Sequence, residues 1–90
     1  MDITLRDTQT NTFLSRTFII KDIDALEHGI IKDDTRFRTV KFKVFGTAIK
    51  CGIAYSFHIF TDSEEEARAV CAKLENGGCI ECTFEKYQKI

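Results

Sequence analysis

The chain has no proline, and it contains no repeat, low-complexity tract or shift of composition that would mark a linker. Its 90 residues are 43% hydrophobic, which is enough for one small core, so we expect a single domain over residues 1–90. The sequence also lacks the run of about 20 apolar residues that a helix needs to span a bilayer. We therefore expect no membrane segment.

An excess of charge of one sign is missing as well. Lys and Arg total 13, Asp and Glu total 14, and the formal net charge is −1. This balance argues against binding to nucleic acid through bulk charge, although it is compatible with a local basic stripe. The first residues lack the basic-then-apolar layout of a signal peptide. We expect a cytoplasmic protein whose four cysteines are reduced.

Signatures of catalysis and of cofactor binding are absent from the sequence. Gly77-Gly78 follows a predicted helix, whereas a phosphate-binding glycine loop precedes one. A nucleophile pair of Cys79 with His58 is an alternative that the spacing does not favour. We expect a protein that is not an enzyme, with no catalytic residue, no metal ligand and no cofactor.

The cysteines invite a redox or zinc interpretation because Cys79 and Cys82 form a C-x-x-C. Residues three apart in a strand point to opposite faces, so this pair is poorly placed to chelate one metal. We expect buried thiols that behave as small hydrophobic side chains. Convergence of Cys51 or Cys71 with this pair on a metal stays open.

Residues 36–60 are predicted to form one long β-hairpin. Apolar residues alternate with polar or small ones on both arms: Val40, Phe42, Val44, Ile49, Cys51, Ile53, Tyr55, Phe57 and Ile59. Gly46-Thr47 lies between the arms and suits a two-residue type II′ turn. This turn would pair Val44 with Ile49 and place Lys43 opposite Lys50. Such a like-charge pair costs stability unless an acidic group meets it.

The opposite face of this hairpin is predicted to be basic. A β-bulge near Arg38-Thr39 would bring the upstream residues into line, although the strand could instead begin near Thr39. The residues that we expect to contact a partner on this face are Arg36, Arg38, Lys41, Lys43, Lys50 and His58. The same charges could simply solvate the sheet and pair with Glu81 and Glu85.

The flanking segments complete an α+β pattern. Strands are predicted over Asp2–Arg6, Phe13–Ile20 and Cys79–Tyr87. The segment Lys21–Ile31 is predicted to be a short helix capped by Asp22, with a 3₁₀ or irregular segment as the alternative.

One long helix is expected to begin after Ser63. Ser63 with Glu66 fits a capping box, and Glu64 with Arg68 is an i,i+4 pair. Gly77-Gly78 should end the helix. Its buried stripe is expected to consist of Ala67, Val70, Cys71 and Leu74.

These elements predict a small, mostly antiparallel sheet of four to five strands with one main and one short helix on one face. A ferredoxin-like sandwich is compatible with the order from residue 13 onward. The run Tyr55–Ala67 resembles the strand–helix half of SPOR peptidoglycan-binding domains. That similarity covers less than half of the chain, and we assign no family.

The expected function is binding. Our first hypothesis is a small protein-binding module that inhibits or regulates a partner with an acidic surface, including the phage-type inhibitors of bacterial defence systems such as CRISPR-Cas. The alternative is a nucleic-acid-binding domain that uses the same basic face, with Phe45, Phe60 and Tyr87 as candidates for base stacking. An exposed strand edge could also pair with a second copy to form a homodimer.

Overall fold

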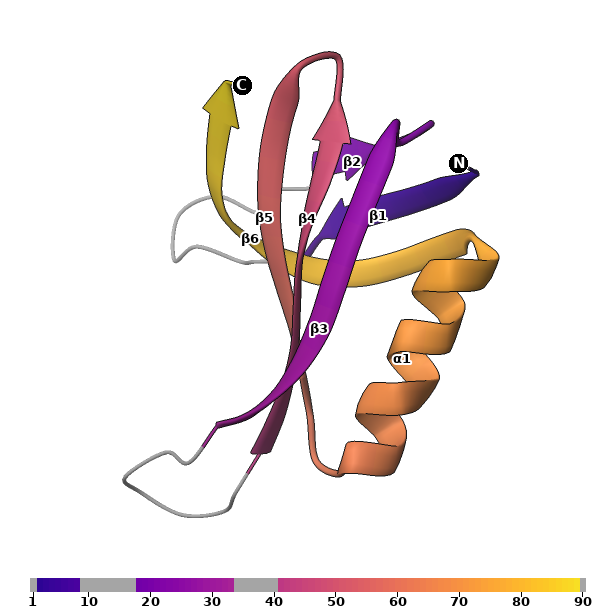
Figure 1. Cartoon of the computed structure of the whole chain (residues 1–90), viewed down its shortest axis with the longest axis vertical. Coiled ribbons are helices and arrows are strands. Elements are labelled where there is room, and N and C mark those ends of the chain that lie inside the picture. Colours follow the sequence, from indigo (N-terminus) through magenta and orange to yellow (C-terminus); the bar gives the residue numbers. More distant parts are fainter. Residues whose placement is uncertain (1, 9–17, 34–40, 90) are drawn as a thin grey trace.

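The computed structural model describes residues 2–8, 18–33 and 41–89, and for residues 33, 41 and 85–89 it describes the backbone. Six strands and one helix lie in these ranges (Figure 1). In chain order they are β1 (Ile3–Asp7), β2 (Phe18–Ile20), β3 (Ala25–Asp33), β4 (Lys41–Lys50), β5 (Ile53–Thr61), α1 (Glu64–Asn76) and β6 (Gly78–Lys89). The α+β class is confirmed.

The strands form one mixed sheet in the order β2-β1-β6-β5-β4-β3. β1 and β6 are parallel, and the other neighbours are antiparallel. The described part of the chain therefore holds six strands and one helix instead of four to five strands and two helices. With a single helix, this arrangement is also not the two-helix ferredoxin-like sandwich. The predicted bulge near residues 38–39 and the first part of the strand predicted over Phe13–Ile20 lie outside the described residues.

The predicted helix over Lys21–Ile31 is wrong, since this segment contains β3. Asp22 does not cap a helix but takes a positive φ of 54° at the bend that leads into the strand. Ala25–Asp33 pairs along its whole length with β4, and β-branched Ile30 and Ile31 suit an extended backbone. Pairing with a long neighbouring strand outweighs the weak helical pattern.

The predicted hairpin turn is also misplaced. β4 runs straight through Gly46-Thr47, and the chain turns at Cys51-Gly52, where φ is 52° and 74°. Two positive φ values are typical of a type I′ turn, whose twist matches the flanking strands. Val44 consequently pairs with Ile59, and Lys43 lies opposite Phe60 instead of Lys50.

The helix prediction is confirmed. Ser63 is the N-cap, and its Oγ accepts a hydrogen bond of 3.2 Å from the Glu66 amide. Gly77 ends the helix with a φ of 86°. The predicted stripe faces the core: Ala67 and Leu74 are buried, and Val70 and Cys71 pack against them in part.

β6 curls the sheet around its core. Its first part pairs with β1 from Gly78 to Cys82, and the rest pairs with β5 from Thr83 onward, with a register shift at Glu85 inside that pairing (Figure 1). A bulge bends a strand and increases its twist, which lets one strand serve both halves of the sheet. The inner faces of β2 and β5 meet through Phe18 and Tyr55, whose ring centroids are 5.7 Å apart. With α1, these faces enclose the core, which includes Ile3, Leu5, Val44, Phe57, Leu74 and Ile80.

Candidate functional site

The side of the sheet that faces away from α1 is set by the alternation in β4. Val44 and Ala48 are buried towards the core, so Lys43 and Phe45 project from the opposite face. The cross-strand register then assembles two rows across β3, β4 and β5. We call the five side-chain-bearing residues of these rows the outer patch: Ile31, Lys43 and Phe60 in one row, and Phe45 and His58 in the other.

The outer patch is more apolar than the sequence suggests. Ile31 is 52% exposed, Phe45 44% and Phe60 50%. The Lys43 ammonium lies 6.0 Å from the centroid of the Phe60 ring, which is at the outer limit of a cation–π contact. The His58 and Phe60 rings meet edge to face at 4.9 Å. Three large apolar groups are therefore displayed together, with one permanent cation beside them.

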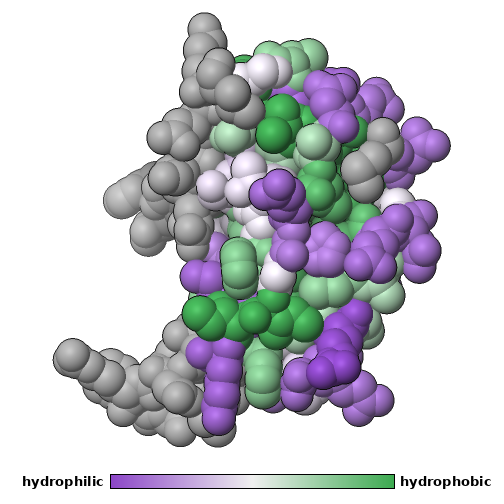
Figure 2. All heavy atoms as spheres, in the orientation of Figure 1, coloured by the Kyte–Doolittle hydropathy of each residue, from purple (hydrophilic) through white to green (hydrophobic). Residues whose placement is uncertain are grey.

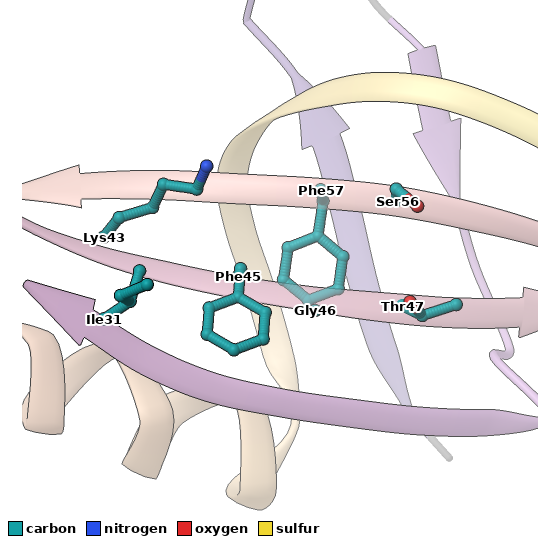
Figure 3. Close-up of a pocket in the computed structure, with 7 residues that line it drawn as sticks. All are labelled: Ile31, Lys43, Phe45, Gly46, Thr47, Ser56 and Phe57. Carbon is teal, nitrogen blue, oxygen red and sulfur yellow. The ribbon is translucent and has the colours of Figure 1, made fainter. Parts of the chain in front are cut away.

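Phe45 lines two hollows in the surface of the sheet. One hollow, of about 310 Å³, is lined by Ile31, Lys43 and Phe45 together with residues of β4 and β5 (Figure 3). The other, of about 190 Å³, shares Phe45 and Thr47 with the first and is also lined by Glu27. Both hollows are shallow and open, so they suit the side chains of a partner surface better than an enclosed small molecule.

Two glycines leave room for aromatic rings on opposite faces of the sheet. Gly29 lies across from Phe45, and a Cβ at Gly29 would be 2.9 Å from the Phe45 ring. Gly46 lies across from Phe57 on the core side, where a Cβ would be 2.5 Å from both the ring and the Glu27 carbonyl oxygen. The missing side chains thus position an exposed ring and a buried ring one residue apart in the same strand.

Lys50 does not belong to this face. It lies on the core side of β4, across from Ile53, where its Nζ donates a hydrogen bond of 2.6 Å to the Asp22 carbonyl. The Asp24 carboxylate is 4.0 Å from the same Nζ and accepts a 3.0 Å bond from the Cys51 amide. Lys50 therefore anchors the β4–β5 turn to the start of β3, and the predicted alignment of Lys50 with Lys43 is wrong.

The other predicted contact residues divide into three groups. Lys43 and His58 lie on the outer patch. Lys41 begins β4, two residues before Lys43, and its side chain is not among those described. Arg36 and Arg38 lie outside the described residues. Sequence reasoning missed Ile31, because the segment that carries it was assigned to a helix; the adjacent pair Ile30-Ile31 was the available signal for a strand.

The cysteines divide between the surface and the core. Cys79 is exposed and Cys82 is buried, as expected for residues three apart in a strand, but Cys51 is exposed in the turn instead of facing the core. Burial, and secondarily the charge of Asp7, raises the pKa of the Cys82 thiol to about 12. Burial and then Glu75 raise the pKa of Cys71. Within the described ranges, no three Cys, His, Asp or Glu residues gather where they could hold a metal ion.

Cys79 and His58 are not brought together by the sheet. His58 lies across from Thr83, and Cys79 is four residues from Thr83 along β6. Four residues of strand span about 13 Å, which exceeds the reach of a nucleophile–base hydrogen bond. His28 has another partner, since its Nε2 is 3.6 Å from the Glu75 carboxylate of α1.

Comparison with known proteins supplies no further constraint. No protein-family profile, curated protein or solved structure matches the chain. In the parts of the chain that the structure describes, no helix is long and apolar enough to cross a membrane.

Proposed function

We propose that this chain is a non-enzymatic protein-binding module whose contact surface is the outer patch. The observation that carries the proposal is the exposure of Ile31, Phe45 and Phe60 on one face of the sheet. Contiguous exposed apolar groups on a small domain are typical of interaction sites. Covering a partner's surface with this face would make the chain an inhibitor or regulator, a class that includes the phage-type inhibitors considered above.

The energetics of the outer patch favour association. Its three large apolar side chains are each about half exposed. Full burial of such a side chain is worth about 1.5–3 kcal/mol, so covering the exposed halves of three contributes on the order of 3 kcal/mol. β4, which carries Phe45, is hydrogen-bonded to a strand on each side, so little backbone ordering opposes binding.

The charge beside the patch indicates the chemistry of the partner. Lys43 lies within it, and the sequence adds Arg36, Arg38 and Lys41 in the segment that leads into β4. An apolar surface that carries a lysine suits a protein surface with apolar side chains and nearby Asp or Glu. We therefore propose an acidic protein partner.

Nucleic-acid binding is the second candidate, and one observation favours it. Phe45 and Phe60 present half-exposed rings on an open sheet face, with His58 and Lys43 next to them. Single-stranded nucleic acids stack their bases on such platforms. Of the described side chains of the outer patch, however, Lys43 is the one with a permanent positive charge, and phosphate binding requires several.

A pull-down from cells of the native host distinguishes these candidates. The baits are the tagged wild-type chain, Lys43→Glu, Phe60→Ser and the control Lys73→Glu, each with and without nuclease. Lys73 is an exposed lysine in the last turn of α1, so its reversal changes the net charge as Lys43→Glu does without touching the outer patch. Circular dichroism verifies the fold of each bait.

We expect one protein to be retained by wild type and by Lys73→Glu. The same protein should be lost from Lys43→Glu and Phe60→Ser, and nuclease should not change its retention. If nuclease abolishes retention, and affinity then falls steeply with salt concentration, the chain binds nucleic acid instead. Equal retention by all four baits would remove the outer patch as the contact surface.

A further inference from the structure

β3 forms a long open edge of the sheet. Its nine residues pair with β4 on one side, and no other described strand lies against the opposite side. Figure 1 looks onto this strand, and Figure 2 shows hydrophobic side chains exposed over its lower part. The strand at the other end of the sheet is β2, of which the structure describes Phe18–Ile20.

The turn between β4 and β5 determines which backbone groups face this open edge. A two-residue turn is closed by a hydrogen-bonded pair, here Lys50 with Ile53. Counting back along β4, even-numbered residues direct their N–H and C=O groups to β5, and odd-numbered residues direct theirs to β3. The odd residues of β3 therefore pair with β4, and its even residues direct their backbone groups outward: Leu26, His28, Ile30 and Lys32.

We propose that this edge pairs antiparallel with β3 of a second copy of the chain, with the two-fold axis at His28. In this register Leu26 lies opposite Ile30 of the partner, and Ala25 lies opposite Ile31. Asp24, one residue before β3, takes no part in this pairing, because its amide donates to the Ile49 carbonyl and its carboxylate accepts from the Cys51 amide. Glu27 meets Gly29, which offers no side chain. The pairs are thus apolar with apolar, an acid beside a glycine, and His28 with its own copy across the axis.

Neighbouring registers are less compatible. An axis at Gly29 places Glu27 opposite Ile31 and Leu26 opposite Lys32. An axis at Ile30 places His28 opposite Lys32. Each of these alternatives buries a charge against an apolar residue or sets cationic side chains together, which costs stability across a strand pair. The matching of Leu26 with Ile30 and of Ala25 with Ile31 therefore selects the axis at His28.

The result would be one continuous sheet with both outer patches on the same face. Half-buried Ile30, which is 37% exposed in the single chain, would be covered, and Ile31 would extend its apolar contact to Ala25 of the partner. This assembly does not depend on the proposed protein-binding function, because its backbone pairing uses the edge of β3; Ile31 is the residue that the edge and the outer patch share.

Sedimentation equilibrium tests the assembly. We compare wild type with Ile30→Lys and with the control Ile19→Lys, which changes an exposed isoleucine of the opposite edge strand. Wild type should dimerise at concentrations up to about 100 μM, and Ile30→Lys should weaken the dimer at least about tenfold while Ile19→Lys leaves it unchanged. A monomeric wild type over this range, or equal dimers for all three, would overturn the proposal.

A disulfide tests the register. In a Cys51→Ser/Cys79→Ser background, His28→Cys places two thiols across the axis, where paired Cα atoms are about 5.5 Å apart and within disulfide range. Oxidation should cross-link His28→Cys chains and leave Ile30→Cys chains, the matched control, unlinked. Cross-linking through position 30 but not position 28 would contradict the proposed axis.

Discussion

At the scale of single residues, two glycines in neighbouring strands make the outer patch possible. Gly29 leaves room for the exposed Phe45 ring, and Gly46 leaves room for the buried Phe57 ring. Neither glycine has a positive φ, so each is needed for the space it leaves and not for its backbone conformation. Sequence reasoning assigned Gly46 to a turn, because glycine is a strong turn signal and close packing across strands leaves no trace in a local pattern.

Alanine at the two glycines should therefore act differently. In Gly46→Ala the new Cβ meets the Glu27 carbonyl and the ring of a core residue, neither of which moves freely, so we expect a loss of about 1–3 kcal/mol. Gly29→Ala pushes on the exposed Phe45 ring, which can swing outward, so its cost should be under about 1 kcal/mol. Urea unfolding of the two variants measures the difference, and equal losses would contradict this packing.

Cys82 provides a prediction about pH. Its pKa is about 12 in the folded chain against an ordinary 9.0, because it is buried and lies near Asp7. The unfolded chain therefore gives up this proton at lower pH than the folded chain. The contribution to stability is complete below pH 9.0 and is lost as the pH rises towards 12.

Cys82→Ala should lose less stability on alkaline titration than wild type does, even if it starts lower because of the cavity. Urea midpoints on either side of pH 9.0 give the comparison for wild type, Cys82→Ala and the exposed control Cys79→Ala. Cys79→Ala should follow wild type. Identical alkaline losses in all three proteins would refute the assignment.

At the scale of elements, strands and helices with a strong local sequence pattern could be predicted from the sequence. The helix after Ser63 was predicted with its cap, its buried stripe and its glycine stop, and all three are present. The last strand was predicted over Cys79–Tyr87, and β6 spans Gly78–Lys89 with Ile80, Cys82 and Phe84 buried. Both elements carry repeated side-chain patterns that a short window of sequence contains.

The elements that were missed depend on partners far away in the chain. β3 is a strand because β4 lies beside it, and the true turn at Cys51-Gly52 is held by Asp24, 27 residues earlier. A cysteine with positive φ is also an uncommon choice for a turn. The outer patch could thus be predicted in part, through Lys43, Phe45, His58 and Phe60. Ile31 could not be placed until β3 was known.

The turn itself can be improved. Asn tolerates positive φ better than Cys does, and the amide of residue 51 would still donate to Asp24. Cys51→Asn should therefore stabilise the fold by about 0.5–1 kcal/mol, measurable as a higher Tm. Cys79→Asn, in a strand with ordinary φ, is the control and should not be stabilising. A lower Tm for Cys51→Asn would mean that the thiol has a packing role.

At the scale of the whole molecule, curvature separates the two faces of the sheet. β6 bends, and β1, β2 and α1 close around one face, so the core is complete without the other face. The side chains of the outer patch are consequently not needed to complete the core. Substitutions there should alter binding more than stability. The open edge of β3 and the outer patch are adjacent surfaces with separate uses.

The affinity for the protein recovered in the pull-down is the most direct test of the outer patch. Phe45 lines both hollows of the outer patch, and binding energy concentrates in residues at the centre of an interface. Isothermal titration should show that Phe45→Ala raises the Kd at least about 30-fold, equivalent to about 2 kcal/mol, while Lys73→Ala stays within about twofold. A Kd for Phe45→Ala equal to that of wild type would contradict the proposed contact surface.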